Sequence, residues 1–133
     1  MSLETARYEA IDPQATGPDA VRRAFVNQVA YCRDNGAPAT AQVCDALAGL
    51  LESERGGAVM ARIRAWEGPP LADALPLRIA GGLHALHLGA IEPSLAPIYV
   101  GTETGDAGAV IADALERHER FLLPWLDGPP QTN

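Results

Sequence analysis

Apolar side chains recur along this chain at every third or fourth position, which is the period of an α-helix with one buried side. The first helix is expected to begin within residues 16–19 and to end at Asn35-Gly36, because proline suits a first helical turn and glycine suits a helix end. The same period predicts a second helix over about 38–54 and a third over about 57–67. The expected core residues of these three helices are Val21, Ala24, Phe25, Val29, Cys32, Val43, Leu47, Leu50, Leu51, Val59, Met60, Ile63 and Trp66.

The segment 75–90 has a different pattern, because nearly its whole circumference is apolar or small. Arg78 is its only permanent charge. A helix that is apolar all round usually lies at the centre of a fold, so we expect this one to be the central helix. Its glycines and alanine at 81, 82, 85 and 89 share one side, which would let a neighbouring backbone come close.

The last third of the chain is irregular at first and then helical. Residues 91–105 predict a loop with one helical turn at 93–96, and PIYV (97–100) is the only plausible strand. A long helix is expected over about 106–123, after which Pro124 bends the chain into a short aromatic turn.

These elements predict an all-α fold, a compact bundle of about five helices around a nearly all-apolar central helix. A chain of 133 residues is long enough for one domain. We divide it into a partly ordered N-terminal extension (1–17), a helical domain (18–127) and a terminal tail or linker (128–133).

Composition narrows the classes of partner. The formal net charge of −7 argues against nucleic acid, which is bound by basic surfaces. No apolar run is long enough for a membrane span, and the first residues do not resemble a secretion signal. Cys32 and Cys44 fit buried thiols in a reducing cytoplasm, although a disulfide between them stays open. We therefore expect a cytoplasmic protein without a nucleic-acid or membrane partner.

The three histidines are the strongest candidates for a functional site, since all of them lie on the apolar faces of predicted helices. His84 and His87 are three positions apart on the central helix, and His118 lies on the apolar side of the last helix. Such a pair could bind one metal ion, with a third ligand from a facing helix. No carboxylate accompanies the pair on its face, however, and histidines bonded to backbone carbonyls explain the pattern more simply.

A second candidate is the run from PIYV to the last helix, which superficially reads as strand, glycine-rich loop and helix, the arrangement that cradles phosphate. The spacing of Gly101, Gly105 and Gly108 matches no nucleotide-binding motif, and Glu103 and Asp106 would repel an anion. Asp106 is better interpreted as a helix cap. We expect no cofactor in this chain.

Two further features have a functional and a structural interpretation. Arg22, Arg23 and Arg33 form a basic side of the first helix that could hold an acidic partner, but pairing with nearby carboxylates explains them more simply. Gln28 lies on the apolar face of the same helix and needs a hydrogen-bond partner. No serine has a sequence context typical of a nucleophile, so no catalytic residue can be assigned.

Three stretches carry a resemblance to a known family: residues 25–47, residues 69–86 with their "ALPLR", and residues 118–133 with the closing "PPQTN". Together they resemble an uncharacterised bacterial family, the domain of unknown function 2332, over about 20–133. The resemblance implies a helical N-terminal region that is followed, in longer members, by a section similar to an S-adenosylmethionine-dependent methyltransferase.

From these features we expect the chain to be an interaction or lid-like module of a methyltransferase-like protein, without activity of its own. Its partner would be a further C-terminal domain or another protein, and an exposed apolar patch could make it self-associate. The alternative is a small metal-binding protein or enzyme that uses His84, His87 and His118.

Overall fold

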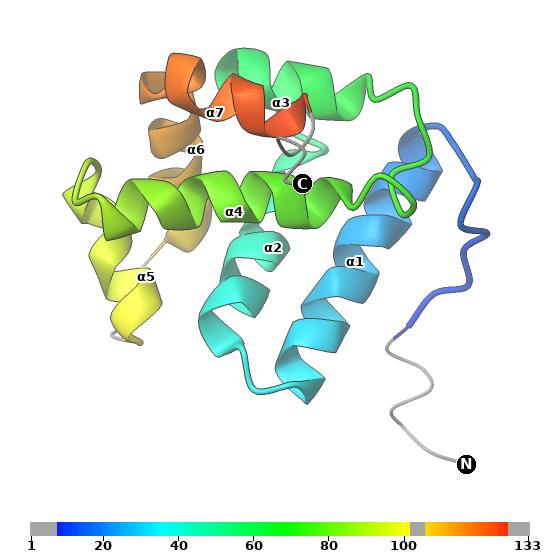
Figure 1. Cartoon of the computed structure of the whole chain (residues 1–133), viewed down its shortest axis with the longest axis horizontal. Coiled ribbons are helices and arrows are strands. Elements are labelled where there is room, and N and C mark those ends of the chain that lie inside the picture. Colours follow the sequence, from blue (N-terminus) through cyan, green and yellow to red (C-terminus); the bar gives the residue numbers. More distant parts are fainter. Residues whose placement is uncertain (1–7, 102–105, 128–133) are drawn as a thin grey trace, which may run out of the picture.

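The computed structural model describes residues 8–101 and 106–127 (Figure 1). Within these residues the fold is all-α, as predicted, and no strand is present. It has seven α-helices and a 3-10 turn rather than about five helices. In order they are α1 (Pro18–Asp34), α2 (Pro38–Leu50), α3 (Gly57–Arg64), α4 (Leu75–Leu88), η2 (Pro93–Leu95), α5 (Ala96–Val100), α6 (Ala107–Arg117) and α7 (Glu119–Leu126).

The helices α1 and α2 form a hairpin that lies below α4 in the view of Figure 1. Pro18 occupies the first turn of α1, and the helix ends at Asn35, whose side-chain and backbone N–H groups both donate to Tyr31 O. Gly36 follows with φ 75°, a left-handed conformation that glycine adopts at no steric cost. Both predicted boundaries of this helix are therefore confirmed.

The second helix ends earlier than predicted, at Leu50 instead of about residue 54. The guanidinium of Arg64 in α3 donates to the carbonyls of Leu50 and Leu51 at 3.0 and 3.3 Å, and the Leu50 carbonyl also accepts from Ser53 N at 3.0 Å, so a short turn and a neighbouring helix satisfy this end of α2. Gly56 then turns the chain with φ 100°, and α3 begins at Gly57.

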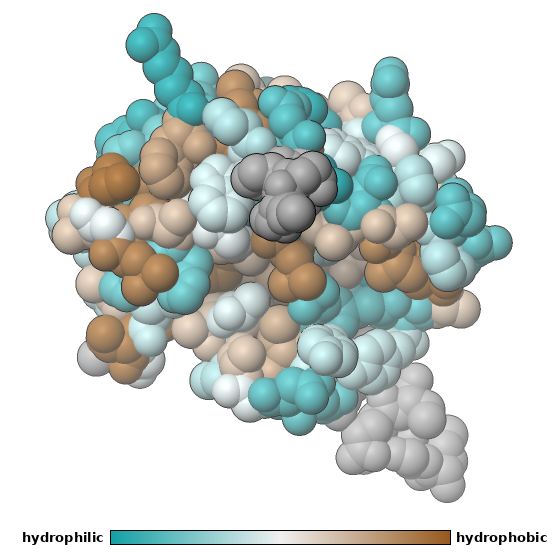
Figure 2. Space-filling model, in the orientation of Figure 1, coloured by the Kyte–Doolittle hydropathy of each residue, from teal (hydrophilic) through white to brown (hydrophobic). Residues whose placement is uncertain are grey.

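Helix α4 runs across the front of the molecule, with α7 along its upper side (Figure 1). It packs on α1, α2 and α7, but it is not enclosed on all sides, because Leu77, His84 and Leu88 are exposed. The expectation of a buried central helix is therefore wrong for this side. Figure 2 shows brown, apolar surface on this same face of the molecule.

The side of α4 that carries Gly81 and Gly82 packs against α7. A Cβ atom on Gly82 would lie 2.9 Å from Leu122 Cδ2 and 3.1 Å from Trp125 Cγ, and one on Gly81 would lie 3.3 Å from the Trp125 ring. The space predicted to admit a neighbouring backbone is instead filled by two side chains of α7, and glycine is needed at 82 to leave them room.

The predicted strand PIYV is instead the short helix α5, which directly follows η2. The predicted long helix over 106–123 is also wrong, because it breaks at His118 into α6 and α7. Pro124 does not end the helical region, as α7 runs through it to Leu126. These two corrections account for the additional helices.

Buried side chains from all seven helices form one hydrophobic core. Its largest fully buried members are Phe25, Leu47, Met60, Ile63, Leu75, Ile79, Leu83, Leu86, Leu95, Ile98, Ile111 and Leu115. No helix within the described residues is long and apolar enough to cross a bilayer.

Candidate functional site

The two histidines of α4 stack on Tyr99 of α5. Ring centroids lie 5.0 Å apart for His84 and Tyr99, 4.6 Å for His87 and Tyr99, and 6.2 Å for the two histidines, with interplanar angles of 22°, 12° and 14°. Burial raises the pKa of Tyr99 to about 12, so its phenol stays neutral. The three-residue spacing thus places both imidazoles against a third ring, and we call these three residues the ring cluster.

His118 does not join this cluster. Its Nε2 lies 2.8 Å from Glu92 Oε1, in the segment between α4 and η2. Within the described residues no three histidine, cysteine or carboxylate side chains are grouped so that they could hold a metal ion. The structure therefore gives no support to a site made of His84, His87 and His118, and their partners are rings and a carboxylate rather than backbone carbonyls.

Glu92 is the centre of a buried polar arrangement between α4 and α6. Only 7% of its surface is exposed, and it is the only buried charged residue described. Its Oε1 is bonded to Arg117 Nε (3.1 Å) and His118 Nε2, and its Oε2 to Arg117 Nη2 (3.2 Å) and Ser94 Oγ (2.6 Å). We call Glu92, Ser94, Arg117 and His118 the Glu92 cluster.

Local sequence explains how these groups meet. Helix α4 ends with Ala90 N donating to His87 O and Ile91 N donating to Leu86 O, which turns the chain towards α6. Pro93 then begins η2, and this turn brings the Ser94 hydroxyl back to the Glu92 carboxylate. The other two members, Arg117 and His118, are the last residue of α6 and the residue at the break.

The hydrogen bonds of this cluster keep the Glu92 carboxyl ionised. The hydrogen bonds of Arg117, followed by that of Ser94, lower the pKa of Glu92 from its ordinary 4.5 to about 2. A carboxylate can only accept, so the ring N–H at Nε2 of His118 is the donor. The cluster borders a shallow hollow of about 370 Å³ lined by residues 116–121.

This geometry orients an imidazole but provides no nucleophile for it. The Ser94 hydroxyl donates to Glu92 and not to His118, and all of the carboxylate's hydrogen-bonding directions are used by the protein. The arrangement is therefore suited to holding α6, α7 and the segment before η2 together.

The arginines of α1 have partners within the chain. Arg22 forms a two-pronged ion pair with Glu9, at 3.0 and 2.8 Å, and both Arg22 and Arg23 contact Asp19. This confirms the simpler interpretation of Arg22 and Arg23, while Arg33 lies exposed at the other end of α1. The segment 8–17 is tied along the helix, since Glu9 N also donates to Asn27 Oδ1 and Arg23 donates to Ala10 O.

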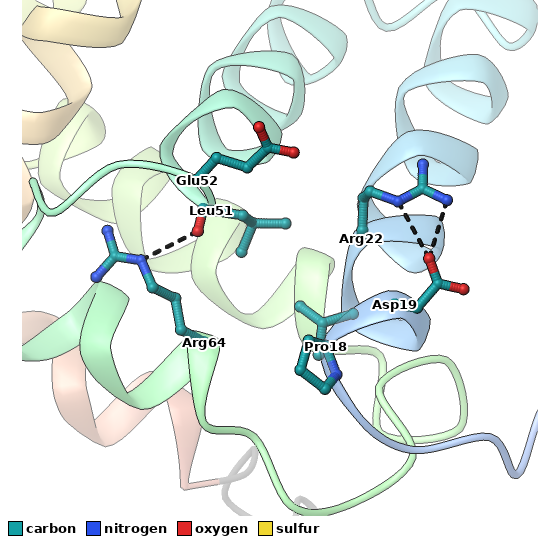
Figure 3. A pocket seen from close by; sticks show the side chains of 7 residues that line it. Pro18, Asp19, Arg22, Leu51, Glu52 and Arg64 are labelled. Atoms are coloured by element: carbon teal, nitrogen blue, oxygen red, sulfur yellow. Dashed lines mark hydrogen bonds and ion pairs between the residues drawn. The ribbon is translucent and has the colours of Figure 1, made fainter.

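A pocket of about 450 Å³ lies between the start of α1 and the end of α2 (Figure 3). Leu51 points into it, while Arg22 and Arg64 lie on opposite sides. Both guanidiniums are bound by the protein itself, Arg22 to Asp19 and Glu9 and Arg64 to backbone carbonyls. No charged group is left buried and unpaired to favour a ligand here.

The other predicted features have mainly structural roles. Asp106 accepts from Ala109 N at 3.1 Å, which confirms it as the cap of α6; Glu103 and Gly105 lie outside the described residues. Gln28 finds its partner in the sulfur of Cys32, at 3.3 Å. Both cysteines are buried and free, and burial raises the pKa of Cys44 to about 12.

Comparison with known proteins agrees with the resemblance noted in the sequence. The family model described as "Uncharacterized protein conserved in bacteria (DUF2332)" matches residues 22–133. The chain belongs to this family. No curated protein and no solved structure was found that matches it. Within the matched part of this DUF2332 chain lie α2 to α7 and most of α1, and thus both the ring cluster and the Glu92 cluster.

Sequence reasoning did not find Glu92 and Tyr99, the residues around which the histidines of this DUF2332 chain are placed. Glu92 directly precedes Pro93 in a segment expected to be irregular, so nothing in the local pattern indicated burial. A signal did exist for Tyr99, because Pro97 suits a first helical turn as well as a strand edge. Reading 96–100 as a helix would have placed an aromatic ring near α4.

Proposed function

We propose that this chain is an interaction module that binds another protein surface through the exposed end of α4 and the adjoining α5. We call this surface the ring patch, and define it as His84, His87, Leu88, Ile91, Tyr99 and Val100. It is formed by the ring cluster together with three neighbouring aliphatic side chains.

The observation that carries the proposal is that the three most exposed aliphatic side chains at this end of the fold lie at the end of α4, just after it, and at the end of α5. Leu88, Val100 and Ile91 are 71%, 67% and 46% exposed. None of the six residues has a permanent charge, in a chain whose net charge is −7. Figure 2 shows several brown areas over this end of the molecule, at the left of the view. Grouped apolar exposure of this kind is typical of protein–protein contact sites.

The resemblance to longer family members suggests which partner to test first. Their further section is similar to an S-adenosylmethionine-dependent methyltransferase, and we propose that the helical domain covers or positions such a section. The end of α7 is held firmly enough for this role, since Arg78 donates to Leu126 O at 3.1 Å and Arg62 forms an ion pair with Asp127. These contacts would set the direction of any section that follows.

The test is to measure binding between this chain and the separately expressed methyltransferase-like section of a longer member, by isothermal titration calorimetry. We expect Leu88→Glu and Val100→Glu to weaken binding at least tenfold, because each places a charge in the apolar contact. Leu71→Glu is the matched control, since Leu71 is exposed outside the ring patch. Absence of binding by the unaltered chain would overturn this choice of partner.

Self-association through the same patch is the other outcome to be measured. Sedimentation velocity over a range of concentrations distinguishes it, because a second copy on the ring patch would give a dimer that Leu88→Glu abolishes and Leu71→Glu does not. A chain that binds neither the section nor itself would contradict the interaction role of the ring patch.

A further inference from the structure

The break between α6 and α7 opposes the local sequence. Residues 106–123 have the apolar period of one continuous helix, but His118 has φ −119° and ψ 37°. Its carbonyl accepts from the amides of Phe121 and Leu122, at 3.1 and 3.0 Å. In the described structure the amides of Glu119 and Arg120 lack the carbonyl partners in α6 that a continuous helix would give them. Some tertiary interaction must therefore hold the break.

The Glu92 carboxylate is placed to do this. It binds the last side chain of α6 and the side chain at the break, Arg117 and His118, through three hydrogen bonds of 2.8 to 3.2 Å. Glu92 is itself buried and is fixed by Ser94, so it is a rigid anchor rather than a mobile surface partner. Charge-assisted bonds to a buried group are among the stronger polar contacts in proteins.

We propose that the Glu92 cluster is a latch: while closed it keeps α6 and α7 bent apart with α7 docked on α4, and when opened it lets α7 swing out towards the line of α6. This inference goes beyond the ring patch, because it concerns the side of α4 that α7 covers.

Release of α7 would expose the side of α4 on which α7 now packs. Leu122 and Leu126 are buried, and Leu122 and Trp125 fill the space left by Gly82. The covered side of α4 is therefore apolar and indented, and α7 is its resident occupant. Three further contacts hold α7 in place. At its start Ala58 N of α3 donates to Glu119 at 2.8 Å, and at its end Arg78 donates to Leu126 O at 3.1 Å and Arg62 forms an ion pair with Asp127. All three would break in the same movement.

Hydrogen exchange measured by mass spectrometry tests the latch in the full chain. In Glu92→Gln we expect the amides of 119–126 to exchange about tenfold faster or more, a factor that corresponds to 1.4 kcal/mol. Exchange in α1 and α2 should stay unchanged. Arg117→Met should act in the same direction, whereas Arg120→Met is the matched control because no contact of Arg120 within the described structure ties α7 down.

A second measurement reports directly on α7. In a Trp66→Phe background Trp125 is the only tryptophan, and its fluorescence should become more accessible to acrylamide in Glu92→Gln. Ser94→Ala removes one bond from the cluster and should give a smaller effect, which keeps the test valid if Glu92→Gln folds poorly.

Two results would overturn the latch. One is faster exchange spread equally over all helices, which would make the Glu92 cluster a general stabiliser. The other is unchanged exchange in α7 for both Glu92→Gln and Arg117→Met. Leu88→Glu, which tests the ring patch, should leave exchange in α7 unaltered, so that failure of one proposal can be told from failure of the other.

Discussion

Glu92 and His118 lie 26 positions apart in the sequence, yet their side chains meet at 2.8 Å and fix where one helix ends and the next begins. The contact couples the segment after α4 to the α6–α7 break. A buried carboxylate with four hydrogen bonds also has consequences that depend on pH.

The stability of the fold should fall in acid over a defined range. The pKa of Glu92 is lowered from 4.5 to about 2, mainly by Arg117, and that of Glu116 is lowered to about 2, mainly by Arg55. A carboxyl group with a lowered folded-state pKa contributes stability that is fully present above the unfolded value and is lost as pH falls through the folded value. We expect the free energy of unfolding to decline from about pH 4.5 down to about pH 2, as measured by urea denaturation.

The matched comparison for this prediction is Glu92→Gln. It should be less stable than the unaltered chain at neutral pH, and the difference between the two should shrink as pH falls below 4.5. An acid dependence of the same slope in both proteins would show that Glu92 is not responsible.

Gly82→Ala should destabilise the domain by about 1–3 kcal/mol, because the added methyl group would press on Leu122 and Trp125 of α7. Gly49→Ala in α2 is the control, since a Cβ there meets nothing within 4 Å and alanine is the better helix former. Thermal unfolding monitored by circular dichroism should therefore show shifts of opposite sign. Equal shifts would contradict the close packing of α7 on α4.

Ala90→Gly should stabilise the domain by about 1 kcal/mol. Ala90 has φ 56°, a left-handed conformation that costs an alanine free energy but not a glycine, and it is exposed. Ala61→Gly, at an exposed position inside α3, should instead destabilise by about 1 kcal/mol. Chemical denaturation of both variants checks the signs, and a destabilised Ala90→Gly would argue against the turn that precedes Glu92.

The thiols should be unreactive in the folded protein. Cys32 and Cys44 are buried, and burial raises the pKa of Cys44 to about 12, so little thiolate exists at neutral pH. Reaction with a chromogenic disulfide reagent should be slow in native buffer and complete in denaturant. Rapid labelling of the native protein would mean that the α1–α2 hairpin opens readily.

The features predicted correctly from the sequence were those determined by neighbouring residues. Pro18 and Gly36 delimit α1 whatever packs on it, and Asp106 caps α6 through an amide three residues away. The helical period of apolar residues in α1 to α3 likewise predicted most of the side chains that are buried there, from Val21 to Ile63.

The features predicted wrongly depend on distant partners. His118 at the helix break is bonded to Glu92, the carbonyls at the end of α2 accept from Arg64, and α4 is open on the side that α1, α2 and α7 do not cover. None of these contacts has a signature within a short window of sequence. The same holds for the candidate site. The sequence indicated that the histidines lie on apolar helix faces, but it did not indicate their distant partners, Tyr99 and Glu92.

The ion pair between Glu9 and Arg22 has a consequence for any acidic molecule that approaches the start of α1. The Glu9 carboxylate already binds the Arg22 guanidinium. Because both residues belong to one chain, Glu9 competes with any free acid for Arg22 at an effective concentration on the order of millimolar. A weakly binding free acid would be outcompeted there. Replacing Glu9 with glutamine should therefore make α1 more receptive to polyanions, with no change in the rest of the fold.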